Sequence, residues 1–199
     1  TANNKRIAFI DALRGFSMLL VIYSHIFAYM TYVNSGINLI LMTFRMPLFF
    51  FISGFFMYSS QYNLILLQHR TKNRILKQLL PTIIFFTLYI ILSGKSFSSG
   101  IASPNKAGYW FTFVSVEIYL IIAPILYFFS INRYCKQYQA IILTLLGMIS
   151  YIAKCLIAQA DEIHPLIAYL DLNFIAVYLP YVILGCIVKM LWNEYEHHM

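Results

Sequence analysis

The composition of this 199-residue chain is that of a multi-pass membrane protein. Hydrophobic residues make up 61% of it and charged residues 11%, against roughly 25% charged residues in soluble domains. A soluble chain of this length could not bury so much apolar surface, so soluble globular classes are excluded. The net charge of +7 comes from short basic clusters between apolar runs, which argues against nucleic acid as a partner and favours a lipid bilayer.

About six apolar segments each approach the roughly 20 residues that a membrane-spanning helix needs. They are 15–33, 37–58, 75–92, 109–131, 140–159 and 173–191. We therefore expect an all-α polytopic transmembrane helix bundle, formed by a single membrane-embedded domain over residues 1–199. Loop lysines and arginines gather on one side of this arrangement, so both ends of the chain are expected in the cytoplasm.

The stretch around the first segment carries three ionisable residues, Asp11, Arg14 and His25. On a helix, Arg14 and His25 lie about 16 Å apart along the axis and within about 20 degrees of one another, with Asp11 one turn before Arg14. An ionisable group inside a membrane costs roughly 2.5 kcal/mol or more and is kept mainly where it faces a cavity. His25 is therefore the leading candidate for chemistry. The alternative is a histidine that only bonds a neighbouring helix.

Polar groups in two further segments have both a functional and a structural interpretation. In the second segment, Arg45 could face a substrate cavity or extend to the lipid headgroups. Ser53 and Gly54 could leave room for a ligand or let a neighbouring helix pack closely. In the fourth segment, Trp110 is expected at the membrane interface. Glu117, two turns deeper, could belong to the same substrate site or serve as a structural partner of a residue such as Arg45.

A basic cluster precedes the third segment and contains Arg70, Lys72, Arg74 and Lys77. Arg74 and Lys77 are one helical turn apart, so they could bind a phosphorylated ligand through charge-assisted hydrogen bonds. We count Arg70, Arg74 and Lys77 as candidates for that role. The alternative is that the cluster only orients the chain and contacts headgroups.

Two connections are expected as loops on the side opposite the basic cluster. Residues 93–108 are rich in Ser, Gly, Lys and Pro, which is typical of a solvent-exposed connection. Residues 160–171 contain Asp161, Glu162, His164 and Asp171, which could touch a substrate but are more often solvated. The three scattered cysteines have no metal-ligand spacing, so we expect no metal site.

Several stretches together resemble the acyltransferase-3 family of membrane-bound acyltransferases. They are RIAFIDALRGF with the later His25, MPLFFFISGFF, KNRILKQLLP, and YWF followed by Glu117. The resemblance implies an O-acyltransferase of the bacterial cytoplasmic membrane. It would move an acyl group, usually acetyl from acetyl-CoA, to a hydroxyl of a cell-surface or secreted carbohydrate. It also implies that His25 is catalytic, that Arg14 supports it, and that Arg74 and Lys77 match a family pair of arginines.

The chain departs from the family pattern in two ways. Lys77 stands where the family has a second arginine, and an ammonium cannot bind phosphate in the bidentate manner of a guanidinium. Family members also generally have more membrane spans than the segments found here. The resemblance therefore implies a shortened member or a chain incomplete at its C-terminus.

A non-catalytic carrier or export component for a glycan or lipid-linked sugar is the alternative function. Transport paths also keep ionisable groups such as Arg45, Glu117 and His25 inside the membrane. A different membrane acyltransferase fold fits less well, because neither His25 nor His69 has an Asp five residues later. No cofactor is expected besides the acyl-CoA donor substrate, and the oligomeric state is left open.

Overall fold

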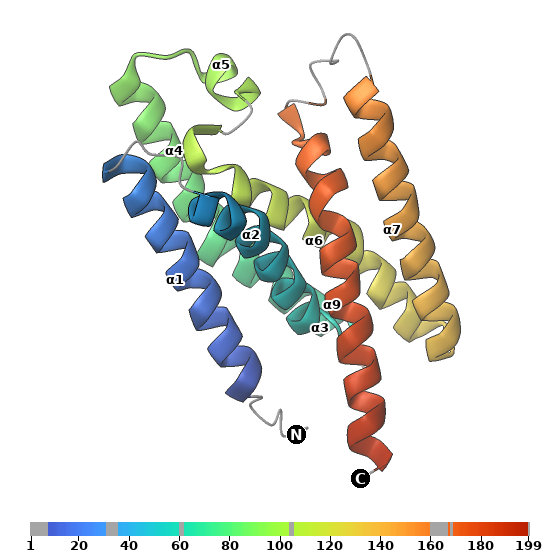
Figure 1. Ribbon diagram of the computed structural model, residues 1–199. Helices are drawn as coiled ribbons and strands as arrows, with labels where there is room; N and C mark the ends of the chain where they lie inside the picture. The colour runs from blue at the N-terminus through green and yellow to red at the C-terminus, as the bar shows by residue number, and fades with distance from the viewer. Residues whose placement is uncertain are drawn as a thin grey trace. The chain divides into compact units, whose positions relative to one another are not determined.

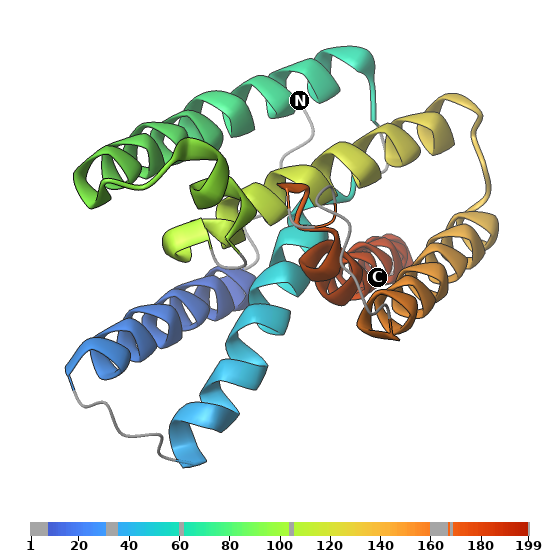
Figure 2. The same ribbon diagram turned by 90° about the horizontal axis from the view of Figure 1, so that it is seen from above.

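The computed structural model describes residues 8–30, 36–59, 62–103, 106–159, 167 and 169–198. Within these ranges, the side chains of a few helical residues, including His25, are not described. The described residues form helices and no strand (Figures 1 and 2), which confirms the predicted all-α class. The longest single helices are α1 (Ala8–Met30), α2 (Gly36–Met57), α6 (Trp110–Ile131), α7 (Lys136–Gln159) and α9 (Leu172–His198).

A further long helix combines α3 (Leu64–Arg74), a π-helical turn (Ile75–Leu79) and α4 (Leu80–Ser93). Pro81 lies inside this helix, where it has no backbone N–H to donate and its ring conflicts with the carbonyl four residues earlier. The π-helical turn, which is wider than an α-helical turn, lies just before this proline.

The start of this helix differs from the sequence prediction. Asn63 caps it, because its side-chain oxygen accepts a hydrogen bond from the Leu66 N–H at 2.7 Å. The predicted third segment, 75–92, is therefore the apolar part of a longer helix. The helix begins at Leu64, so the basic cluster lies on a helix that leads directly into the apolar span.

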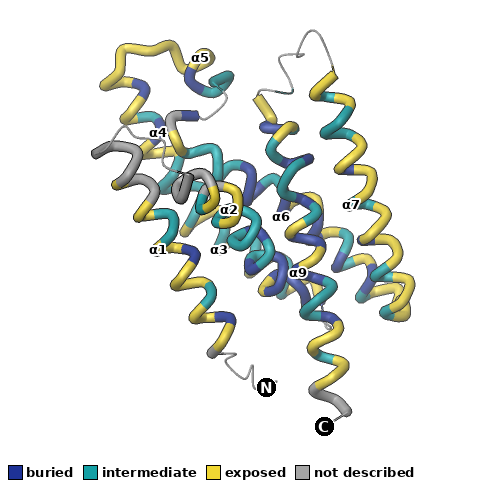
Figure 3. Tube along the Cα trace, viewed as in Figure 1, coloured by how far each residue is buried: buried dark blue, intermediate teal, exposed yellow. Residues whose placement is uncertain are grey.

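Helix length and exposed apolar surface both indicate a bilayer environment. The stretches Leu64–Ser93, Trp110–Ile131, Lys136–Gln159 and Leu172–Tyr195 are long and apolar enough to cross a membrane, and the apolar helix Thr43–Met57 is shorter. Much of α4 and α7 is exposed (Figure 3), and their exposed residues include large apolar ones such as Leu92 and Leu156. Apolar side chains on the outside of a helix are stable in lipid and unfavourable in water.

The chain divides into two compact units, and α9 contributes to both, with the boundary at Pro180. Unit 1 comprises the described parts of Thr1–Met57 and Tyr181–Met199. In it α1 lies beside α2. Its core contains Ile10 of α1 with Ile52 and Phe55 of α2.

Unit 2 comprises Tyr58–Pro180, and α6 is its most buried long helix. The rod formed by α3, the π-helical turn and α4 lies along α6 (Figures 1 and 2). The short helix α5 (Phe97–Ala102) and a 3-10 turn (Lys106–Gly108) connect α4 to α6. The expectation of a fully exposed connection is wrong at two residues, because Gly100 and Lys106 are buried.

Candidate functional site

Helix α1 carries the first group of candidate residues and belongs to unit 1. It is continuous from Ala8 to Met30, so Arg14 and His25 share one helix as the sequence predicts. The side chains of Asp11 and Arg14 are exposed, whereas Ser17 is buried and donates a hydrogen bond to the Arg14 carbonyl at 2.8 Å. The side chain of His25 lies outside the described residues, so the catalytic role of His25, Arg14 and Asp11 stays a prediction.

Helix α2 carries the second group, and its two polar side chains are half-buried. Arg45 lies near the middle of the helix and Ser53 near its end. Gly54 is buried where α2 meets the second part of α9 within unit 1: a Cβ atom there would overlap the carbonyl group of Val182. The Cys186 thiol of α9 also donates to the Gly54 carbonyl at 3.3 Å. Of the two interpretations of Gly54, the geometry favours close helix packing.

Helix α6 in unit 2 carries Trp110 and Glu117 on one face, two turns apart. The Trp110 ring is half-buried and stacks on Phe174 of α9 at 4.4 Å between centroids, and on Tyr178 at 5.5 Å. Glu117 is half-buried too, and its Oε2 is enclosed with no hydrogen-bond partner among the described residues. A carboxylate in such surroundings is costly unless a partner or bound molecule satisfies it, which fits a residue that faces a site.

A buried ion pair, which the sequence did not reveal, joins the starts of two spans in unit 2. Lys106 lies in the 3-10 turn before α6 and pairs with Asp171, which directly precedes α9; the side chains are 2% and 3% exposed. Lys106 Nζ also donates to the Tyr169 carbonyl at 3.3 Å. The expectation of a solvated acidic loop is wrong for Asp171, while Asp161, Glu162 and His164 lie outside the described residues.

The burial of this pair has an electrostatic consequence. Burial raises the pKa of Asp171 above its ordinary value, and the hydrogen bond and charge of Lys106 act in the opposite direction. A carboxyl group with a raised pKa binds its proton more tightly in the folded state. It therefore favours folding at acid pH, and this contribution is lost as pH rises through the folded pKa.

We expect Lys106→Met to lower the free energy of unfolding by about 3–5 kcal/mol near neutral pH, because it leaves a buried carboxylate without its cation. The loss should be smaller at acid pH, where a carboxyl group with a raised pKa holds its proton. Thermal unfolding of the detergent-solubilised protein across pH measures both effects. Lys95→Met, at an exposed lysine, is the control. A loss for Lys106→Met that is equal at all pH values would contradict the role given to Asp171.

The basic cluster on α3 does not form one uniform surface. Arg74 is half-buried against α6: its Nη1 donates to the Ser115 carbonyl at 3.3 Å and to Ser115 Oγ at 3.2 Å. Its guanidinium carbon lies 4.6 Å from the centroid of the Tyr119 ring. Lys77, on the π-helical turn, is exposed instead. The contacts of Arg74 with Ser115 and Tyr119 of α6 are not those of a residue that only contacts lipid headgroups. Lys77 is exposed and does not share these half-buried surroundings.

Arg70 has a similar arrangement one turn before Arg74. Its guanidinium carbon lies 5.2 Å from the centroid of the Tyr62 ring. Tyr62 is buried, and burial raises the pKa of its hydroxyl, with the nearby Arg70 charge acting in the opposite direction. Its backbone N–H donates to Ser130 Oγ of α6 at 3.0 Å, which fixes the start of the helix against α6.

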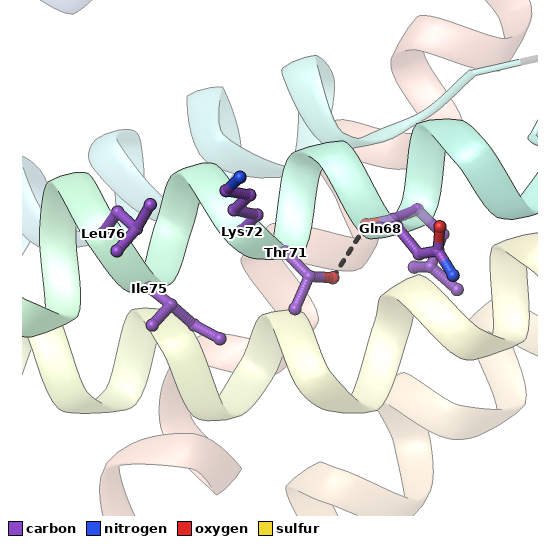
Figure 4. A pocket seen from close by; sticks show the side chains of 6 residues that line it. Gln68, Thr71, Lys72, Ile75 and Leu76 are labelled. Carbon is purple, nitrogen blue, oxygen red and sulfur yellow. Dashed lines mark hydrogen bonds between the residues drawn. The ribbon is translucent and has the colours of Figure 1, made fainter.

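An open apolar groove of about 520 Å³ runs along the same helix (Figure 4). It is lined by Leu67, Gln68, Thr71, Lys72, Ile75 and Leu76. Figure 4 shows Thr71 and Ile75 pointing toward α6. Thr71 contributes to both the groove and the neighbouring polar contacts, because its hydroxyl lies 3.1 Å from the Tyr119 hydroxyl. Among the described residues, no three His, Cys, Asp or Glu side chains come together as a metal site.

These features define a multi-pass α-helical membrane protein with ionisable residues on its spans. A family model described as an acyltransferase domain, that of the acyltransferase-3 family, matches residues 7–198. No curated protein and no solved structure matches the chain. Because the match covers nearly the whole sequence, the chain belongs to the acyltransferase-3 family, and the resemblance predicted from its motifs is confirmed.

Proposed function

We propose that this protein transfers an acyl group, acetyl from acetyl-CoA, to a hydroxyl of a cell-surface or secreted carbohydrate. The family match over residues 7–198 carries the proposal. The residue types support it, because an intramembrane histidine supplies a proton acceptor and a basic helix supplies groups that bind phosphate. The protein is proposed to act in the bacterial cytoplasmic membrane with both ends of this chain in the cytoplasm, as the distribution of lysine and arginine indicates.

His25 is the proposed catalytic residue. Its neutral imidazole would take the proton of the acceptor hydroxyl while the hydroxyl oxygen attacks the thioester carbonyl. The new C–O bond forms as the C–S bond breaks, and the CoA thiolate regains a proton on leaving. Arg14, on the same side of α1 and about 16 Å from His25 along the axis, would support the site as the family resemblance implies. The imidazole could also accept the acyl group itself before the carbohydrate does.

The acceptor is proposed to approach Glu117 and Trp110 of α6. A carboxyl oxygen that is enclosed and has no partner within the described part of the chain suits a sugar hydroxyl, and aromatic rings present apolar faces with polar edges. The donor is proposed to approach the basic helix α3. Between Asp11 and Glu117 the sequence contains no Asp or Glu, so this part of the chain favours an anionic ligand.

The test compares cells that contain the protein with cells in which its gene is inactivated. Surface carbohydrate is purified, its alkali-labile acetate is measured, and the value is divided by the amount of sugar. The proposed activity predicts that loss of the protein lowers acetate per sugar and leaves the amount of surface carbohydrate unchanged. The opposite result, less surface carbohydrate with unchanged acetate per sugar, would favour the carrier function.

A further inference from the structure

The two members of the buried ion pair in unit 2 both have a strained backbone. Lys106 and Asp171 have φ angles of 38° and 48°, in the left-handed region that residues other than glycine rarely adopt. Within the part of the chain that the structure describes, Arg133 is the third non-glycine residue with a positive φ, and it is exposed. A strained backbone persists only where its surroundings hold it, and such residues cluster at functional sites.

The ion pair directly precedes an aromatic stack between α6 and α9. Trp110 follows Lys106 by four residues, and Phe174 follows Asp171 by three. The Trp110 ring lies nearly parallel to the rings of Phe174 and Tyr178, with interplanar angles of 24° and 25°. The two helices contribute rings to one stack, so the stack forms only when the starts of α6 and α9 keep a fixed separation. The ion pair joins those two starts.

The ion pair also lies close to Glu117. The Nζ atom of Lys106 is 5.8 Å from the ring centroid of Phe113, which is one helical turn before Glu117. The charges of Asp171 and Lys106 both act on the Glu117 carboxyl group. Because Lys106 neutralises Asp171, repulsion between the two acidic side chains is reduced. The enclosed Oε2 of Glu117, for which the described stretches offer no hydrogen-bond partner, can then accept a bond from a ligand.

We propose that Lys106 and Asp171 are positioning residues of the acceptor site, whose ion pair holds Trp110 in its stack so that Trp110 and Glu117 present one fixed surface to the sugar. This inference rests on the proposed function, which places the acceptor at these two residues. An aromatic ring packs against the C–H face of a sugar, and a carboxyl oxygen accepts a bond from a hydroxyl. Groups that are fixed before binding lose less conformational freedom on binding.

The first experiment measures the KM of each substrate and kcat, with acetyl-CoA and purified, de-O-acetylated surface carbohydrate, below the Tm of every variant. We expect Lys106→Met and Asp171→Asn each to raise the acceptor KM about 10-fold and to change the KM of acetyl-CoA less than about 2-fold. Loss of folded protein lowers the maximal rate and leaves KM unchanged. An unchanged acceptor KM would therefore identify a merely structural pair and overturn the inference.

The charge-exchanged protein, Lys106→Asp combined with Asp171→Lys, keeps an ion pair and serves as the rescue variant. We expect its acceptor KM to return to within about 3-fold of the wild-type value, because the two changes act on one interaction. This variant decides the question if a single variant does not fold. A folded charge-exchanged protein with the high acceptor KM of the single variants would overturn the role of the pair.

The stack is tested separately with Phe174→Leu, which removes one ring and leaves the ion pair in place. We expect about a 10-fold rise in the acceptor KM. Tyr138→Leu is the matched control, because Tyr138 is an exposed aromatic residue of α7, and it should change the acceptor KM less than about 2-fold. Equal effects of Phe174→Leu and Tyr138→Leu would contradict a role of the stack in acceptor binding.

Carbohydrate binding can be measured without acyl transfer through the fluorescence of Trp110. The chain contains two tryptophans, Trp110 and Trp192, so Trp192→Phe leaves Trp110 as the single tryptophan. De-O-acetylated carbohydrate should change its emission in a saturable manner, and Lys106→Met should raise the half-saturating concentration about 10-fold. Emission that does not respond to carbohydrate would overturn the placement of the acceptor at the stack.

Binding and transfer can fail independently. If carbohydrate binds at Trp110, binding weakens in Lys106→Met and no acyl group is transferred from acetyl-CoA, the inference stands and the proposed function fails. If acyl groups are transferred and the acceptor KM is unchanged in Lys106→Met and in Phe174→Leu, the proposed function stands and the inference fails.

Discussion

Replacing His25 with alanine should reduce acyl transfer by about 100- to 10,000-fold while the amount of membrane-inserted protein stays the same. The expected loss follows from chemistry, because the acceptor hydroxyl must lose its proton as the new ester bond forms. An alanine methyl group cannot take that proton. The rate is measured in membranes as acetyl transferred from acetyl-CoA per amount of protein, the latter from an immunoblot.

His69→Ala provides the matched control for this prediction. His69 lies exposed on α3, where its ring contacts the side chain of Asn73, so its loss removes an imidazole and leaves the proposed chemistry intact. We expect transfer within about 3-fold of the wild type, as for most exposed substitutions. Transfer retained by His25→Ala at the level of His69→Ala would remove His25 from the mechanism.

Gly54→Ala and Gly185→Ala should each destabilise unit 1 by about 1–3 kcal/mol. A Cβ atom at Gly54 would overlap the backbone of Val182, and one at Gly185 would overlap the Phe51 carbonyl oxygen and approach the Phe55 nitrogen to 2.7 Å. Both obstacles are backbone atoms, which cannot rotate away as a side chain can. Helices α2 and α9 would have to separate, and the packing gained from their close approach would be lost.

Gly15→Ala is the control for the glycine variants, and it should have the opposite sign. Gly15 lies within α1, and a Cβ atom there would meet nothing within 4 Å. Alanine favours a helix over glycine by roughly 1 kcal/mol, so Gly15→Ala should match or exceed the wild-type Tm. In thermal unfolding by size-exclusion chromatography, unchanged Tm values for Gly54→Ala and Gly185→Ala would contradict the close packing.

The helical architecture could be predicted from the sequence because apolar runs of membrane length have few other stable structures. Each predicted segment lies within a helix over nearly all of its described residues, and the differences lie at polar boundaries. The helix that contains the third segment begins at Leu64 because Asn63 caps it, and a single capping residue gives a weak signal within a basic stretch. The buried pair of Lys106 and Asp171 was missed for a related reason: residues far apart in the sequence become partners only through tertiary packing.

The candidate site was predictable to the extent that its residues interrupt apolar segments. Arg74 stood out as a cation at the start of a span, and Glu117 as a carboxylate inside one. Tyr62 and Tyr119 did not, because a tyrosine in an aromatic-rich membrane protein usually packs or anchors at the interface. Their contacts with Arg70 and Arg74 depend on how α3 lies along α6, and neither helix alone contains that information.

The most direct measurement is transfer of a labelled acetyl group. Membranes that contain the protein are incubated with acetyl-CoA labelled in the acetyl carbon and with purified surface carbohydrate, and the carbohydrate is then treated with mild alkali. The account predicts labelled acetate released from the carbohydrate, at a level that depends on the protein and falls in His25→Ala membranes. Carbohydrate that stays unlabelled, while the same membranes hold intact folded protein that binds CoA, would contradict it.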